Sequence, residues 1–121
     1  MKKPTSSAAP VDRLVGRRRS WTSWKEGVSR ELLEVVWRDC NWCCRWCGSR
    51  DRCGVDHIIP KSRGGQNTRQ NFQLLCNKCG SWKGNDMPEQ LLFRLSRLRT
   101  TSRWSAAVKR NGTRQMSEAL A

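Results

Sequence analysis

The stretches Cys44-Arg-Trp-Cys47 and Cys76-Asn-Lys-Cys79 decide what this chain can fold into. Each contains two cysteines separated by two residues, a spacing that closes a tight turn around one metal ion. Two such pairs, separated by a segment that returns to the same place, supply the four thiolates of a structural zinc site. We therefore predict one structural Zn²⁺ ion bound by Cys44, Cys47, Cys76 and Cys79.

Three further cysteines lie near the first pair, so the choice of ligands has an alternative. Cys40 and Cys43 have the same spacing and are an equally good pair on this ground alone. We favour the later pair because Gly48 follows it, and glycine permits the positive φ at which such turns often close. Cys53 is expected to pack as a small apolar residue. Cys40 and Cys43 remain free thiols or alternative ligands.

The size and charge of the chain point to a small metal-stabilised protein with a polyanionic partner. The chain has 121 residues, and its central part is too small to be held by an apolar core alone. Zinc binding contributes about 10–16 kcal/mol in small modules, enough for most of the folding free energy. Lysine and arginine number 24 against 10 acidic residues, a formal net charge of +14. This positive charge favours nucleic acid as the partner, with an anionic membrane surface as the second alternative.

Seven cysteines could also indicate a secreted disulfide scaffold. The start of the chain, MKKPTSSAAPVDRLVG, contains no apolar segment of the kind that directs secretion. No apolar run approaches the length of about 20 residues that a membrane-spanning helix needs. We therefore expect a cytosolic protein with reduced thiols, in the host cytosol if the protein is viral, and no membrane partner.

Two short strands and a helix are expected between and after the cysteine pairs. The strands cover about residues 51–58 and 72–75, and Gly-Gly punctuation indicates a loop over 61–67 between them. A short helix should begin after Cys79. The predicted fold is thus a small α+β domain, a zinc-stapled β-loop-β-α unit.

A helix is expected on each side of this unit. Ser23 and Glu26 have the spacing of a capping box, and an apolar pattern follows, so we predict a helix over 24–39. A second capped start at Asp86 precedes a leucine stripe that predicts a helix over 87–99.

The two ends are expected to lie outside the folded domain. Residues 1–20 are rich in arginine and are interpreted as a basic disordered arm, with an organellar transit peptide as the alternative. The folded domain would then cover 21–99. Residues 100–121 are predicted to form a basic polar tail with a turn at Asn111-Gly112.

The chain has seven tryptophans and no tyrosine. Four of them surround the cysteine pairs and are expected to make most of the core: Trp37, Trp42, Trp46 and Trp82. Three lie near basic segments and are better candidates for contact with DNA or a partner: Trp21, Trp24 and Trp104.

Two motifs lie between the cysteine pairs: Val-Asp56-His57-Ile-Ile-Pro60-Lys-Ser-Arg-Gly-Gly65 and, directly before the second pair, Asn71-Phe-Gln-Leu-Leu75. Together with the cysteines they resemble the HNH endonucleases of the ββα-metal fold, in their four-cysteine zinc-bound form. The resemblance covers about residues 40–95 and includes the Lys-Gly pair at Lys83 that often ends the motif.

The resemblance implies roles for three residues by position. Asp56 would ligate a single catalytic divalent metal, Mg²⁺ or Mn²⁺. His57 would be the general base that activates water, and Asn71 would hold the loop that orients the histidine. The family usually has His or Asn directly after the last cysteine, as the second protein ligand of that metal, whereas this chain has Gly80. Residues that could compensate are Asn77, Asn85 and Asp86, and water is a further alternative.

The chemistry of the residues is compatible with these roles. Phosphodiester hydrolysis needs a nucleophile made from water and charge neutralisation on the phosphoryl and leaving oxygens, and one divalent metal can supply the neutralisation. His57 can act on water because imidazole is largely neutral at pH 7. Neighbouring strand residues point to opposite faces, so we expect an irregular strand end if Asp56 and His57 serve one site.

The sequence therefore predicts a small metal-dependent DNA endonuclease that nicks or cuts both strands. The residues expected to contact DNA phosphates are Lys61, Arg63, Lys83, Arg17, Arg18 and Arg19. One alternative is a zinc-bound DNA-binding module that has lost its catalytic metal. Another is an accessory subunit of a larger DNA-processing machine, such as a phage packaging motor, because small members of the family are common in phages and mobile elements.

Overall fold

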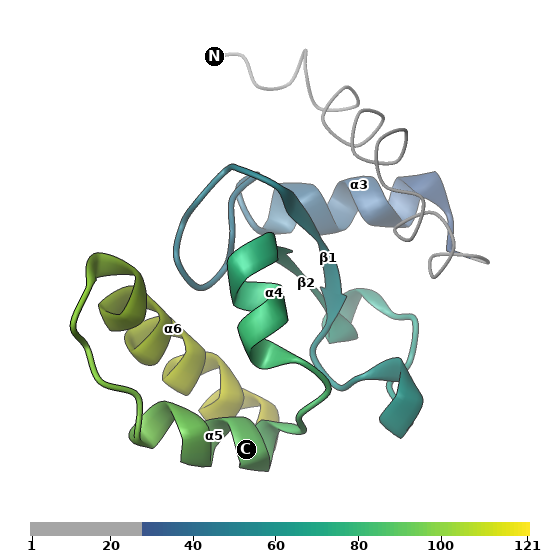
Figure 1. Cartoon of the computed structure of the whole chain (residues 1–121). Helices are drawn as coiled ribbons and strands as arrows, with labels where there is room; N and C mark the ends of the chain where they lie inside the picture. The colour runs from purple at the N-terminus through teal and green to yellow at the C-terminus, as the bar shows by residue number, and fades with distance from the viewer. Residues whose placement is uncertain (1–27) are drawn as a thin grey trace.

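The computed structural model describes residues 28–121. It consists of a two-stranded sheet surrounded by helices (Figure 1). The elements are α3 (Arg30–Asp39), β1 (Cys53–His57), β2 (Phe72–Cys76), α4 (Asn77–Lys83), α5 (Pro88–Ser96) and α6 (Arg103–Leu120), with 3₁₀ turns at Lys61–Arg63 and Arg69–Asn71 between the strands. The expectations that fall outside the described residues are the arm 1–20 with Arg17, Arg18 and Arg19, the Ser23-Glu26 box, Trp21 and Trp24. No helix within the described part of the chain is long and apolar enough to cross a membrane.

The two strands are antiparallel, and α4 follows them directly. Cys53 pairs with Cys76 at one end of the ladder, and His57 pairs with Phe72 at the other. Every residue of β2 is buried, because helices pack around the sheet (Figure 1). The predicted fold class, a small α+β domain with a ββα unit and flanking helices, is confirmed.

Helix α3 begins later than the sequence pattern suggested. Residues 24–27 of the predicted helix over 24–39 lie outside the described residues, and the prediction is wrong at Val28 and Ser29, which are not helical. Ser29 is the N-cap, and its Oγ accepts a hydrogen bond from the Leu32 N–H at 3.1 Å. The helix buries Val36 and Trp37 in the core.

Helices α4 and α5 also have different caps from those expected. Helix α4 starts at Asn77 rather than after Cys79. Helix α5 starts after Met87, whose N–H donates to Gln90 Oε1 at 2.8 Å. Asp86 does not cap this helix, because its carboxylate pairs with the Arg94 guanidinium at 2.7 Å.

An 18-residue helix, α6, occupies the place of the predicted polar tail. The turn predicted at Asn111-Gly112 is wrong, because Gly112 lies inside this helix where it packs on α5. A Cβ at Gly112 would lie 3.1 Å from Leu95 Cδ2, so the glycine permits close approach of the two helices. The folded unit therefore continues past residue 99 and buries Val108 and Met116 of α6.

Helix α6 is also attached to the first cysteine pair through Trp46. This indole is fully buried, and its Nε1–H donates to Gln115 Oε1 at 2.8 Å. The Asn111 side chain donates to the Trp46 carbonyl at 2.7 Å. The tryptophans expected in the core lie in it or pack against it: Trp37, Trp42, Trp46 and Trp82.

Candidate metal centre and active site

Four cysteine sulfurs meet where the first cysteine turn approaches the end of β2. The Sγ atoms of Cys44, Cys47, Cys76 and Cys79 all lie within 4.8 Å of one another. A tetrahedral Zn²⁺ site with Zn–S bonds of about 2.3 Å places its sulfurs about 3.8 Å apart. The Cys47 and Cys76 sulfurs are 3.5 Å apart. The donor set and its dimensions thus fit a structural zinc ion.

Backbone and indole N–H groups orient these sulfurs. The Cys47 N–H donates to Cys44 Sγ, and the Cys79 N–H donates to Cys76 Sγ, each at 3.4 Å. Gly48 has φ +84°, the left-handed conformation expected at the close of the first turn. The Trp104 Nε1–H donates to Cys79 Sγ at 3.3 Å. Trp104, expected to contact DNA or a partner, is therefore half-buried against the cluster instead.

Three of the four thiols have shifted pKa values, and the directions of the shifts show how the thiols influence one another. A hydrogen bond from Cys79 lowers the pKa of Cys44 to about 4. Burial raises the pKa of Cys47 to about 11, and the hydrogen bond with Cys44 raises the pKa of Cys79. Among these three thiols the protein groups favour the thiolate at Cys44, and a bound cation would favour the deprotonated form of the others as well.

The other three cysteines lie outside this cluster. Cys40 and Cys43, the alternative pair, are not among the described groups whose ligand atoms converge. Burial raises the pKa of Cys53 to about 12, and its thiol donates to the Ser49 carbonyl at 3.1 Å. Cys53 thus packs as a small buried thiol beside its strand, as expected.

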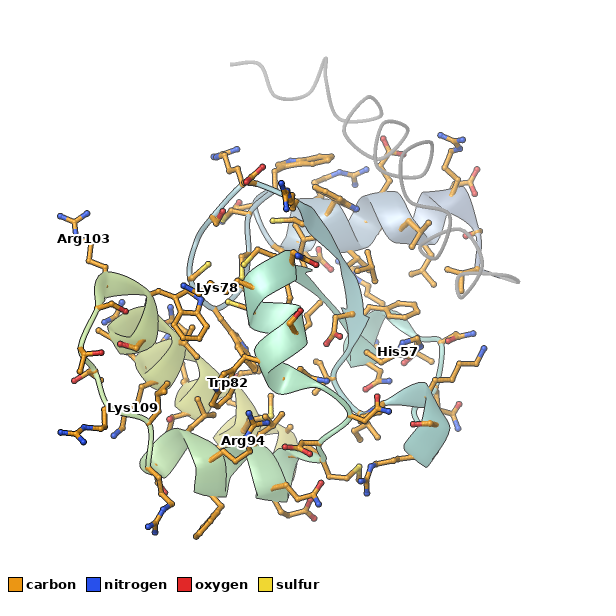
Figure 2. All side chains as sticks on the ribbon, in the orientation of Figure 1. His57, Lys78, Trp82, Arg94, Arg103 and Lys109 are labelled. Atoms are coloured by element: carbon orange, nitrogen blue, oxygen red, sulfur yellow. The ribbon has the colours of Figure 1, made fainter. Side chains whose placement is uncertain are left out.

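His57 is the last residue of β1 and is buried (Figure 2). Its ring packs edge-on against Phe72, with 4.8 Å between the ring centroids. Its Nε2 lies 2.8 Å from Asn67 Oδ1. Sequence reasoning missed Asn67, because a polar residue in a glycine-containing loop carries no periodic signal that links it to the histidine.

Asn71 ties together the loop that leaves β1. Its Oδ1 accepts from the Ile59 N–H at 2.8 Å, and its Nδ2 donates to the carbonyls of Ile59 and Gln66 at 3.1 and 2.9 Å. Gly65 is needed in the same loop, because a Cβ there would lie 1.7 Å from the Ile59 carbonyl oxygen. The loop that carries Asn67 to His57 is therefore fixed from both sides.

Asp56 lies beside a buried ammonium group. The Lys83 Nζ is 3.3 Å from Asp56 Oδ2 and donates to the His57 carbonyl at 2.8 Å. The Gln73 Nε2–H donates to the same carboxylate at 3.2 Å. Burial raises the pKa of the Asp56 carboxyl, and the Lys83 charge opposes this shift. The expectation that Lys83 contacts DNA from the surface is corrected, because its side chain is only 1% exposed.

The strand end is regular where we expected it to be irregular. β1 keeps its pairing through His57, and exposure alternates along it, so Asp56 and His57 lie on opposite faces. Both residues nevertheless line one cavity of about 470 Å³, together with Gly80 and Lys83. The irregular backbone begins only after His57, in the loop that Asn71 fixes.

The cavity shows what could replace the missing side chain at Gly80. A Cβ at this position would have no atom within 4 Å, so the space beside it is open. Asn77 and Asn85 line the cavity, whereas Asp86 does not and is paired with Arg94 instead. In the described residues, Gln73 Oε1 is buried without a hydrogen-bond partner. A divalent ion would thus find one carboxylate here and amide oxygens around it.

The two basic residues expected at the cavity rim are placed differently. Lys61 and Arg63 both belong to the exposed 3₁₀ turn after β1. Lys61 lines the cavity and Arg63 does not. Of the two, Lys61 is therefore the one positioned to reach a phosphate in the cavity.

Comparison with known proteins links this chain to endonucleases. Residues 40–96 match a family described as HNH endonuclease. A CRISPR-associated endonuclease Cas9 of Corynebacterium diphtheriae is 39% identical over 46 residues, which cover 35% of this chain and 4% of that protein. The matched region contains the four-cysteine cluster, His57 and its loop, and ends before α6. Residues 40–96, a little under half of this chain, thus match the HNH endonuclease family.

Proposed function

We propose that the chain is a metal-dependent DNA endonuclease with His57 as general base and Asp56 as ligand of one catalytic Mg²⁺ or Mn²⁺ ion. Family membership implies phosphodiester hydrolysis and a DNA substrate. The observation that carries the finer proposal is the single cavity lined by Asp56, His57 and the open position at Gly80.

The contact between His57 and Asn67 supports the role of a base. A carbonyl oxygen only accepts hydrogen bonds, so Asn67 Oδ1 places the ring hydrogen on Nε2. The basic lone pair then lies on Nδ1, the nitrogen that takes the proton from water. Asn71 would act on His57 indirectly, because it fixes the loop that carries Asn67.

Asp56 is the carboxylate available to a divalent ion in this cavity. Such an ion, held by Asp56 and by substrate phosphate oxygens, would neutralise charge on the phosphoryl group and the leaving oxygen. The Lys83 ammonium orients the Asp56 carboxylate from inside the protein and ties it to the His57 backbone. Lys61 at the cavity rim, and Arg17, Arg18 and Arg19 in the proposed basic arm, would bind DNA phosphates.

A second candidate is a zinc-bound DNA-binding module without catalysis. One observation favours it: among the described residues, the one carboxylate that lines the cavity already has a buried ammonium partner, and Gly80 supplies no side-chain ligand. The four-cysteine cluster and the basic surface would serve this module equally well.

Incubation with supercoiled plasmid separates the two functions. The purified protein is expected to convert the plasmid to nicked or linear forms with Mg²⁺ or Mn²⁺, and to leave it intact without added divalent metal. Zinc content is measured in parallel, so that loss of the structural ion is not mistaken for loss of the catalytic one. A mobility shift without cleavage under any metal condition would select the binding module.

Gly80→Asn is expected to strengthen the catalytic metal site. The new side chain enters open space in the cavity and supplies an amide oxygen near Asp56. The metal concentration for half-maximal cleavage should fall by about tenfold, the lower end of what single side chains around metal sites contribute. With Asp56 and water as its main ligands, the wild-type site should also prefer Mn²⁺ to Mg²⁺.

Gly80→Ala is the matched control, since it removes the helix-destabilising glycine without adding a ligand. The alanine variant should keep the wild-type metal requirement. An equal metal requirement in the asparagine and wild-type proteins would mean that another group already fills the position. Asn77 and Asn85 would then be the next residues to replace with alanine.

A further inference from the structure

Helix α6 carries a stripe of arginines that the catalytic cavity does not use. Arg103, Arg110 and Arg114 are exposed. They are separated by seven and four residues, so at 3.6 residues per turn they lie within about 20° of one line along the helix. The stripe is about 16 Å long at 1.5 Å per residue. We call these three residues the α6 arginine stripe.

The stripe faces away from the packed side of the helix. The buried residues of α6 are Ser105, Val108, Gly112, Gln115 and Met116, and their helical positions centre on the side opposite the stripe. In Figure 2, Arg103 projects from the end of α6 that lies far from His57. The stripe is thus a surface separate from the catalytic cavity.

The charge around the stripe is one-sided. The chain contains no aspartate or glutamate from Gln90 to Ser117. Within residues 28–121, the ion pairs join Arg69 to Asp39, Lys83 to Asp56 and Arg94 to Asp86, so none of them involves the stripe. Glu118, four residues after Arg114 on the same helix, is the nearest acidic residue along the chain, and within residues 28–121 it forms no ion pair with the stripe.

We infer that the α6 arginine stripe binds the phosphate backbone of duplex DNA outside the cleavage cavity. The inference rests on the proposed function for the identity of the polyanion. Guanidinium groups bind phosphate in a fixed, bidentate geometry, and such contacts need no apolar surface. Contact of this kind is independent of sequence.

The residues of the stripe do not fit the two other kinds of partner, an anionic membrane surface and a protein. A helix that lies on a membrane surface needs a large apolar face to insert. The core of a protein interface is enriched in aromatic and apolar residues. The exposed large hydrophobic residues of the described chain are Phe93, on α5, and Leu120, at the last turn of α6. Neither belongs to the stripe.

The attachment of α6 lets the stripe hold DNA relative to the catalytic unit. Gln115 and Asn111 bond to Trp46 in the first cysteine turn, and Trp104 bonds to Cys79 in the cluster. DNA bound along the stripe is therefore held by an element fixed to the zinc cluster. Helix α6 lies beyond the residues that match the HNH family.

The test compares the salt dependence of DNA binding in two triple variants. The stripe variant carries Arg103→Gln, Arg110→Gln and Arg114→Gln, and the control carries Arg30→Gln, Arg38→Gln and Arg50→Gln at exposed positions on another part of the surface. Fluorescence anisotropy with a random-sequence duplex, without added divalent metal, gives the slope of log K against log salt. Each arginine–phosphate interaction that a variant removes should flatten that slope by about 0.9, so the slope of the stripe variant should be shallower by up to about 2.7.

The full set of outcomes decides the inference. The control should keep the wild-type slope, and a triple Arg→Lys stripe variant should keep most of it, because charge rather than shape sets the salt dependence. Equal flattening in the stripe variant and the control would overturn the inference, as would an unchanged slope in the stripe variant. Loss of binding to phosphatidylserine vesicles, with DNA binding intact, would also overturn it in favour of a membrane.

The same proteins separate this inference from the proposed function. All variants should keep stoichiometric zinc and a cooperative melt, since the substituted residues are exposed. If the salt dependence is shallower in the stripe variant but the wild-type protein never nicks plasmid, the inference about the stripe stands and the proposed endonuclease function is contradicted. If the wild-type protein nicks plasmid but the stripe variant keeps the wild-type slope, the endonuclease function stands and the inference about the stripe is contradicted.

Discussion

Replacement of Cys76 by serine is expected to unfold the domain and abolish stoichiometric zinc binding. Cys76 is the last residue of β2 and the N-cap of α4, and its sulfur lies among the four that converge. Zinc contributes about 10–16 kcal/mol in small modules, which is comparable to the whole net stability of a typical domain, about 5–15 kcal/mol. Loss of one of four thiolates should therefore remove most of the stability. Zinc content by metal analysis and thermal unfolding by circular dichroism measure both effects.

Cys43→Ser is the matched control for this experiment. Cys43 is half-buried, and its thiol contacts only the Cys40 carbonyl at 3.5 Å among the bonds within the described residues. It belongs to the alternative pair, Cys40 and Cys43, which has the same spacing as Cys44 and Cys47. Cys43→Ser should keep one zinc per chain and a cooperative melt. Retention of zinc by Cys76→Ser, or its loss in Cys43→Ser, would mean that the ligand set is wrong.

Features set by short-range spacing could be predicted from the sequence. The two cysteine turns bring four sulfurs together because each turn is closed by neighbouring residues, with Gly48 in the left-handed conformation. The two strands were predicted within a few residues of their ends because the apolar run and the glycines mark them. Asn71 was assigned to the loop through the family resemblance, and its three hydrogen bonds lie in that loop.

Features set by long-range packing could not be predicted. Gly112 looked like a turn, yet it marks where α6 approaches Leu95, a contact that depends on the fold. Trp104 was a candidate for contact with DNA or a partner because it lies near a basic segment, yet its indole N–H donates to Cys79, 25 residues earlier. Lys83 looked like a DNA contact, yet it is buried against Asp56, 27 positions earlier in the chain. In each case the decisive neighbour is distant in sequence.

The largest effect on catalysis is expected at His57. Its removal as a general base should lower the cleavage rate by about 10²–10⁴-fold, the range that positioned acids and bases contribute. DNA affinity should be nearly unchanged, because binding depends on lysines and arginines rather than on one imidazole. Cleavage of supercoiled plasmid under single-turnover conditions, with DNA affinity measured separately, tests both expectations.

His57→Gln is a better variant than His57→Ala for this purpose. The imidazole is buried and packs on Phe72, so alanine would leave a cavity as well as remove the base. Glutamine keeps much of the volume and can still donate a hydrogen bond to Asn67 Oδ1, but its amide cannot accept a proton at neutral pH. Zinc content and the thermal melt should therefore match the wild type. Gln70→Ala, at an exposed position in the same loop, should cleave at the wild-type rate.

Added imidazole gives the sharper form of the same test. In His57→Ala, the space left beside Phe72 and Asn67 can admit a free imidazole, which would supply the missing base. Cleavage by the alanine variant should rise with imidazole concentration, whereas the glutamine variant, whose side chain fills the space, should respond little. Near wild-type cleavage by His57→Gln without any addition would remove His57 from the mechanism. The proton would then have to pass to another group that lines the cavity with Asp56.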